Sequence, residues 1–349
     1  MRIDRLISTS AILLFLGGCA AQGQDTAQTS AHGPHAPSAD GGRPALYNTL
    51  GGYSYRITTS SAEAQRWFDQ GLRLVYAFNH LEAQRAFREA ARLDPVCAMC
   101  FWGIAITEGS NYNAPTNTDR ERKAATAAQE ASRLSAGASP PARAMIQALA
   151  KRHSTDPAAK RETLDRAYAD AMREVARQFP DDLEAATFFA DSMMNLRPWN
   201  LWTPDGAPQP GTEEIVATLE RVLKRDPDHI GANHLYIHAV EASNHPEHAL
   251  ESAGRLPVLA PGAGHLVHMP SHIYARVGDY QAAAGSNREG GEPRHPCAHR
   301  SGLLPFVFAA RYFKIEDRLP CVQPAYADPL PSSRYRNSSA STSFASGSA

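Results

Sequence analysis

Several features are scarce in this chain of 349 residues, and each absence excludes a class of protein. The formal net charge is −1, so no excess of positive charge points to nucleic acid or to an anionic membrane surface. No window alternates Val, Ile or Thr with polar residues, which excludes a sheet beyond a short piece at residues 53–59. The phosphate-binding loop, the nucleophile elbow and the zinc-protease helix are also missing, so no nucleotide cofactor is expected. What is left predicts an all-α protein.

Cysteine is rare, with five in the whole chain. Cys97 and Cys100 form a C-x-x-C pair at the expected start of a helix, but Phe101 follows where covalent haem attachment requires histidine. Haem is therefore excluded. Because exported proteins usually oxidise such a pair, we predict a structural disulfide, with redox exchange and metal ligation as the alternatives.

The N-terminus has the pattern of an export signal. Basic residues near the start precede an apolar run that ends at Leu16, too short to span a membrane in a folded protein. Residues 16–19 read Leu-Gly-Gly-Cys and resemble the bacterial lipoprotein box, in which the cysteine is acylated. The resemblance implies a signal peptide at residues 1–18 and membrane contact through a lipid on Cys19, at the periplasmic face of the cell envelope. Residues 19–45, poor in apolar side chains, are expected to form a flexible tether.

A helical repeat starts at Trp67. The spacing of large, small and proline residues resembles the tetratricopeptide repeat (TPR), a helix-turn-helix unit of 34 residues. Small residues let two helices approach, large ones fill the space between them, and proline ends the second helix. We therefore predict antiparallel helical hairpins stacked in a right-handed superhelix over residues 46–284. The matching residues are Trp67, Gly71, Leu74, Ala83, Phe87, Ala90, Asp94 and Pro95.

Prolines set the register of the later repeats, which end at Pro95, Pro180, Pro227 and Pro261. The last two prolines are 34 residues apart. The spacing from Pro180 to Pro227 is longer because of an insertion at residues 197–211, which is expected to form a loop. The first helices of the last two units should start near Ile230 and Gly264. The TPR residues are degenerate between 119 and 179, but amphipathic patterns at 142–150 and 164–175 predict helices there.

The repeat period also separates two histidine pairs. His234 and His238 are followed 34 residues later by His268 and His272. An i, i+4 pair projects from one helical face, and equivalent faces of neighbouring units line the same concave groove. Four imidazoles should therefore converge. Imidazole is the commonest transition-metal ligand near neutral pH, and such a set would suit zinc or copper.

Other residues accompany the histidine pairs. Glu241, three residues after His238, is interpreted as a metal ligand, an orienting partner of a histidine, or a general base. Pro270 lies inside the last histidine helix, where it should remove a hydrogen bond and kink the chain. Further candidates for the groove are His265, Asp191 and Trp202. Histidines expected in turns or on the surface are His229, His245 and His248.

Four stretches, at residues 78–83, 94–103, 232–242 and 268–273, look like a family of exported bacterial TPR proteins. The resemblance covers roughly residues 60–284 and implies the repeat fold, but no established activity. Beyond residue 284 the pattern stops, because Asn287 and Gly290 stand where apolar residues are expected. Residues 285–349 are therefore predicted to be an irregular or disordered tail, either natural or produced by a shifted reading frame.

Three classes of function fit these features. The favoured one is an envelope lipoprotein whose TPR scaffold binds a protein or peptide partner in its groove and carries a His-lined transition-metal site. The second is a metal-dependent hydrolase or oxidoreductase with Glu241 as base. The third is a metal-free scaffold for peptides or proteins. Binding is preferred to catalysis.

Overall fold

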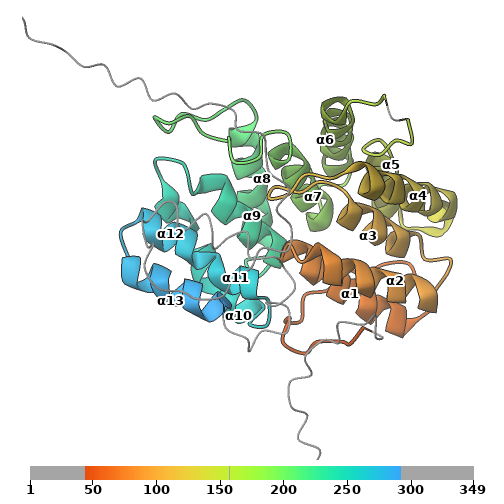
Figure 1. Ribbon diagram of the computed structural model, residues 1–349, viewed down its shortest axis with the longest axis horizontal. Coiled ribbons are helices and arrows are strands. Elements are labelled where there is room, and N and C mark those ends of the chain that lie inside the picture. The colour runs from red at the N-terminus through yellow and green to blue at the C-terminus, as the bar shows by residue number, and fades with distance from the viewer. Residues whose placement is uncertain (1–43, 157, 292–349) are drawn as a thin grey trace, which may run out of the picture. The chain divides into compact units, whose positions relative to one another are not determined.

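The computed structural model describes residues 44–156 and 158–291, and helices dominate both ranges (Figure 1). In these ranges β pairing is confined to two isolated bridges, so the all-α prediction is confirmed. The short sheet expected at residues 53–59 is wrong, because this segment hydrogen-bonds to side chains of the first helix instead. The signal peptide, Cys19, most of the tether and the tail from residue 292 lie outside the described residues. No described helix combines the length and apolar character that crossing a bilayer requires.

The helices follow one another with short connections. They are α1 (Ala62–Tyr76), α2 (His80–Leu93), α3 (Ala98–Glu108), α4 (Thr118–Leu134), α5 (Pro140–Ala150), α6 (Arg161–Gln178), α7 (Leu183–Met194), α8 (Thr212–Arg225), α9 (Ile230–Val240), α10 (Leu250–Leu259), α11 (Gly264–His268), α12 (Pro270–Arg276) and α13 (Tyr280–Gly291), with short 3-10 helices η1 (Ser135–Gly137) and η2 (Pro246–Ala249).

Each of the four prolines predicted to end a repeat follows the end of a helix in the structure. Helices α2, α6, α8 and α10 each end two residues before their proline, since the residue that precedes a proline is disfavoured in the helical region. Helices α9 and α11 begin at Ile230 and Gly264, as predicted. The insertion at residues 197–211 is a loop between α7 and α8, and the two amphipathic segments of the middle region are α5 and α6.

Neighbouring helices pack side by side, as Figure 1 shows for α1 with α2 and for α12 with α13. Phe87 of α2 shows why the repeat needs small residues. A Cβ added to Gly71 would lie 2.6 Å from the Phe87 ring, and one added to Gly103 would lie 2.3 Å from it. Only glycine at these two places lets α1 and α3 approach α2 this closely.

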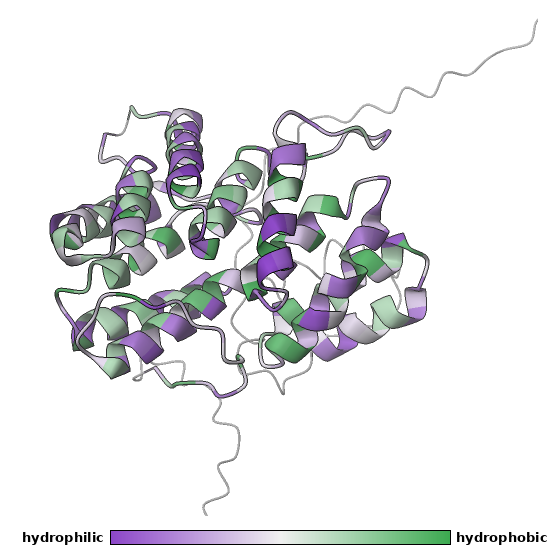
Figure 2. Cartoon of the chain, turned by 180° about the vertical axis from the view of Figure 1, so that it is seen from behind, coloured by the Kyte–Doolittle hydropathy of each residue, from purple (hydrophilic) through white to green (hydrophobic). Residues whose placement is uncertain are grey.

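Helix α9 is buried on all sides. Most helices carry both hydrophilic and hydrophobic residues around their circumference (Figure 2), but all eleven residues of α9 are buried. It packs against α7, α8, α10 and α12, and also against α1, which is far away in sequence. Gly231 allows this approach, because a Cβ there would lie 2.3 Å from the ring of Tyr76. The packing of α1 on α9 joins the first helix to the helix that carries His234 and His238.

Pro270 interrupts the last histidine helix as predicted. Helix α11 ends at His268 and α12 begins at Pro270, while Met269 between them keeps helical angles of φ −52° and ψ −37°. Proline lacks the N–H that would continue the hydrogen-bond ladder. The Nε2 atoms of His268 and His272 lie 3.0 Å apart across this interruption.

The expected end of regular structure at residue 284 is wrong, because α13 continues to Gly291 and packs against α11 and α12. The two residues that did not fit an apolar pattern are the ones that face α11. Asn287 accepts a hydrogen bond from His268. A Cβ added to Gly290 would lie 2.7 Å from the carbonyl oxygen of Gly264, so glycine is required for the close approach.

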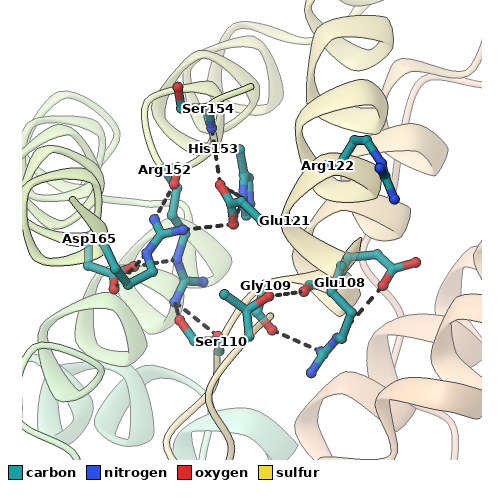
Figure 3. A network of polar contacts seen from close by, with 12 residues as sticks. Glu108, Gly109, Ser110, Glu121, Arg122, Arg152, His153, Ser154 and Asp165 are labelled. Carbon is teal, nitrogen blue, oxygen red and sulfur yellow. Dashed lines mark hydrogen bonds and ion pairs between the residues drawn. The ribbon is translucent and has the colours of Figure 1, made fainter. Parts of the chain in front are cut away.

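A buried arginine fixes the loop after α3. Arg152, 1% exposed, donates to the carboxylate of Asp165 and to both oxygens of Ser110 (Figure 3). Arg161 binds both Asp165 and Glu121, which ties α6 to α4. The loop held in this way leads from Ser110 to Tyr112, whose aromatic ring contacts His238.

Two glycines of α13 test the close packing. Gly290→Ala should lower the free energy of unfolding by about 1–3 kcal/mol, because its methyl group meets the backbone of α11. Gly285→Ala is the matched control: nothing lies within 4 Å of its Cβ position, so better helix propensity should stabilise the protein by up to about 1 kcal/mol. Urea denaturation measures both, and equal effects of the two changes would contradict this packing.

Candidate metal centre

Five histidines from α9, α11 and α12 form a closed circuit, named here the five-histidine cluster. Adjacent ring centroids are separated by 5.0 Å for His234–His238, 5.4 Å for His238–His272, 4.9 Å for His272–His268, 5.9 Å for His268–His265 and 4.9 Å for His265–His234. The structure therefore brings together both predicted pairs and adds His265, which the sequence placed only on the same helical face.

Two of the five rings are oriented by distant parts of the chain. His234 Nδ1 lies 2.5 Å from the carbonyl oxygen of Tyr76, one of the last carbonyls of α1, which has no partner within its own helix. His268 Nδ1 contacts the amide oxygen of Asn287 in α13. Both partners are acceptors, so each Nδ1 carries the proton and each Nε2 carries a lone pair.

Glu241 orients two further rings. Its Oε1 lies 2.8 Å from Nδ1 of His238, and its Oε2 lies 2.6 Å from Nδ1 of His272. A carboxylate that accepts from the Nδ1–H of a metal-binding histidine is a common arrangement, because it fixes the tautomer and increases the basicity of the ligand nitrogen. Of the three roles considered for Glu241, this geometry supports that of orienting partner.

Two pairs of Nε2 atoms consequently face one another. His268 Nε2 and His272 Nε2 are 3.0 Å apart, and the Nδ1 atom of each ring is held by an acceptor. His234 Nε2 and His265 Nε2 are 3.1 Å apart. Nε2 of His238 is buried and has no hydrogen-bond partner among the described residues. Lone pairs at hydrogen-bond distance repel unless a proton or a metal cation lies between them.

The charges of the cluster also suit a cation. Burial lowers the pKa of His234, His238, His265 and His268, the last to about 3, so these imidazoles are neutral at pH 7. Burial would raise the pKa of Glu241, but the charge of His272 and the hydrogen bonds from His238 and His272 outweigh it and lower that pKa. Four neutral imidazoles and a buried carboxylate anion therefore lie in one cluster.

Among the described residues, three sets of three donors are close enough to hold an ion, and two of them lie in the cluster. The donor atoms of His234, His238 and His265 lie within 4.8 Å of one another, and so do those of His238, Glu241 and His272. A third such set, His245, Glu247 and His248, is exposed on η2. Only the first two sets belong to the five-histidine cluster.

The cluster is more enclosed than the expected open groove. His234 and His238 are 0% and 2% exposed, whereas His265 and His272 are half-buried. Phe78, with its ring 4.5 Å from that of His234, covers one side. The difference arises because the packing of α1 against α9 closes over the first histidine pair.

An exposed aromatic residue covers the other side. The Trp199 ring lies 5.3 Å from His238 and 6.4 Å from His272, and Trp199 is 46% exposed. Tyr112, in the loop fixed by Arg152, contacts both Trp199 and His238, with ring centroids 5.1 Å and 5.2 Å away. Trp199 of the insertion loop is therefore an exposed aromatic side chain in contact with the cluster.

The other candidates surround the cluster without joining a donor set. Trp202 donates its indole N–H to the carbonyl of Ala239 and so fastens the insertion loop to α9. Asp191 lines a small cavity of about 20 Å³ behind Phe78, and burial raises its pKa to about 6. A cavity of this size holds about one water molecule.

The predicted structural disulfide is formed. Cys97 and Cys100 are bonded at the start of α3, and both are buried. Cys97 also caps the helix, because its sulfur accepts from the N–H of Cys100. The pair lies in the core of the first repeats.

A second buried polar cluster was missed by sequence reasoning. Glu184 accepts from the hydroxyls of Tyr53 and Tyr76, and burial raises its pKa to about 7. His229 contacts Tyr53 at 2.9 Å and is fully buried, so its expected surface position is wrong. The sequence did contain a signal for this position. The His229 side chain accepts a hydrogen bond from the backbone N–H three residues later and so caps α9, as Asp182 does for α7.

Comparison with models of known protein families and with curated proteins finds no match to this chain. The resemblance to exported TPR proteins stays a prediction. The chemistry of the five-histidine cluster is therefore defined by its own geometry.

The orienting role of Glu241 can be tested by Glu241→Gln. The amide keeps one acceptor oxygen but replaces the other with a donor, so only one of the two histidines keeps its tautomer. We expect the affinity for Zn²⁺ to fall about 10- to 100-fold in a competition titration. Glu247→Gln, which removes the partner of exposed His245, is the matched control and should leave this affinity unchanged. Equal affinities in all three proteins would refute the role.

The pH dependence of binding follows from the lowered pKa values. Zn²⁺ requires neutral imidazoles, and protons compete only below the pKa of the folded site. Because the pKa values of His234 and His265 are well below the ordinary value and that of His238 is also lowered, the Zn²⁺ affinity of this set should fall less between pH 7.5 and 5.5 than that of three exposed histidines. Below its pKa, an exposed histidine ligand would lower the metal affinity about tenfold for each pH unit. Titrations at three pH values check this, and a hundredfold loss between pH 6.5 and 5.5 would contradict it.

Proposed function

We propose that this protein is a metal-binding protein of the bacterial cell envelope, with a transition metal held by the five-histidine cluster of a TPR-like scaffold. One observation carries the proposal: the Nε2 atoms of His268 and His272 face each other at 3.0 Å while the Nδ1 atoms of both rings are held by acceptors. When both rings are neutral, a bound cation removes the repulsion between their Nε2 lone pairs and uses both.

The donor set favours zinc or copper. Neutral imidazole nitrogens suit zinc, copper, iron and nickel, whereas magnesium and calcium prefer oxygen. The carboxylate of Glu241 is engaged by two Nδ1–H groups, which leaves nitrogen as the dominant donor. Among the metals that accept such a set, zinc and copper are proposed because both accept four or fewer imidazoles in a compact site.

The scaffold and location complete the proposal. The small-residue contacts around Phe87 and the regular proline stops support stacked TPR-like hairpins in a right-handed superhelix. The pattern of an export signal and the resemblance of residues 16–19 to the lipoprotein box support attachment to the membrane through a lipid on Cys19. A protein or peptide partner would then bind the scaffold near the insertion loop, where Trp199 is exposed beside the histidines.

Elemental analysis of the untagged protein tests the proposal. The wild type should retain zinc or copper and unfold at a higher temperature when either is added, because saturation at a hundred times Kd stabilises a protein by about 2.7 kcal/mol. The variant His238→Ala/His272→Ala should lose both effects. The control His245→Ala/His248→Ala, which removes the exposed set, should keep them. A wild type that neither contains nor takes up zinc or copper would sink the proposal and favour a metal-free scaffold.

A further inference from the structure

The five-histidine cluster contains more donors than one ion can use. Zinc in proteins is almost always four-coordinate, with nitrogen at about 2.0–2.1 Å. Two nitrogens bound to the same ion are therefore at most about 4.2 Å apart. Among the described residues, no set of donor atoms that lie within 4.8 Å of one another contains more than three of the five histidines, and His268 is in none of these sets. The five histidines in this arrangement therefore do not share one ion.

The donors divide into two groups. His234, His238 and His265 form a set with donor atoms within 4.8 Å of one another. His268 belongs to neither donor set of the cluster, but its Nε2 lies 3.0 Å from Nε2 of His272. Two imidazoles on one zinc ion at a tetrahedral angle have nitrogens about 3.3 Å apart. Both Nε2 pairs, at 3.1 Å and 3.0 Å, are close to that spacing.

His238 and Glu241 connect the groups. The unpartnered Nε2 of His238 is a donor for the first group, while its Nδ1 shares Glu241 with His272 of the second group. One carboxylate thus orients a ligand in each group. The ring centroids of His238 and His272 are 5.4 Å apart, so the two groups are adjacent.

We propose that the cluster is a two-ion centre, one ion bound by His234, His238 and His265 and the other by His268 and His272. This inference rests on the proposed function and specifies how the metal is held. The second ion has only two histidine ligands, so it keeps open positions for water or for a small oxygen- or nitrogen-donor ligand. Adjacent ions with open positions can bind one such ligand together.

Metal stoichiometry tests the two-ion centre. All proteins carry His245→Ala/His248→Ala, so that the exposed set does not contribute. The full untagged chain is loaded with Zn²⁺, freed of excess metal and analysed for zinc per chain. The reference protein should bind one ion more than His234→Asn/His265→Asn and one ion more than His268→Asn/His272→Asn. Circular dichroism and thermal unfolding without metal show whether each variant folds.

Loading with Cu²⁺ adds a second measurement. Two adjacent copper ions couple magnetically, so the reference protein should show a paramagnetic resonance signal well below its copper content, while each double variant should show the full signal of one copper. If a double variant fails to fold, the single changes His265→Asn and His272→Asn at the half-buried positions replace it.

The outcomes separate the two proposals. One ion per reference chain, lost in both double variants, overturns the two-ion centre but keeps the metal-binding function. No ion in the reference chain overturns both. A difference of one ion for each double variant, with the loss of coupling, supports the two-ion centre.

Discussion

The hydrogen bond from His234 Nδ1 to the carbonyl oxygen of Tyr76 is the constraint on which the rest of the site depends. It satisfies a carbonyl that the end of α1 leaves without a helical partner, and it fixes the tautomer of a fully buried imidazole. It forms only because Gly231 lets α9 approach the Tyr76 ring. The same contact closes one side of the histidine cluster.

The protein places unusual polar groups in its core and satisfies them with local partners. Glu184 receives two tyrosine hydroxyls, and Glu241 receives two imidazole N–H groups. A buried ionisable group without partners costs several kcal/mol, so such groups are retained only where the surroundings supply hydrogen bonds. The two clusters differ in one respect: the tyrosine cluster is saturated with donors, whereas the histidine cluster presents lone pairs. The second arrangement is the one that a cation completes.

Much of the local structure could be predicted because it depends on short-range rules. Proline stops α2, α6, α8 and α10, and Pro270 divides the last histidine helix, since these effects act within one turn. The histidine spacing placed four of the five rings on the right faces. Asn287 and Gly290 were misread because their roles exist only against α11. His229 was misread because burial depends on the packing of the N-terminal segment, about 175 residues away.

By itself the sequence determined the helices, their stops, the disulfide pair and the shared face of the histidines, because periodicity and backbone chemistry are local. Tertiary structure alone decided which carbonyl, carboxylate or amide holds each Nδ1, and therefore which nitrogen is free to bind. It also decided that the first histidine pair is enclosed and that His265 joins the others. These outcomes depend on contacts between segments far apart in the chain, such as α1 with α9, and no repeat pattern encodes them.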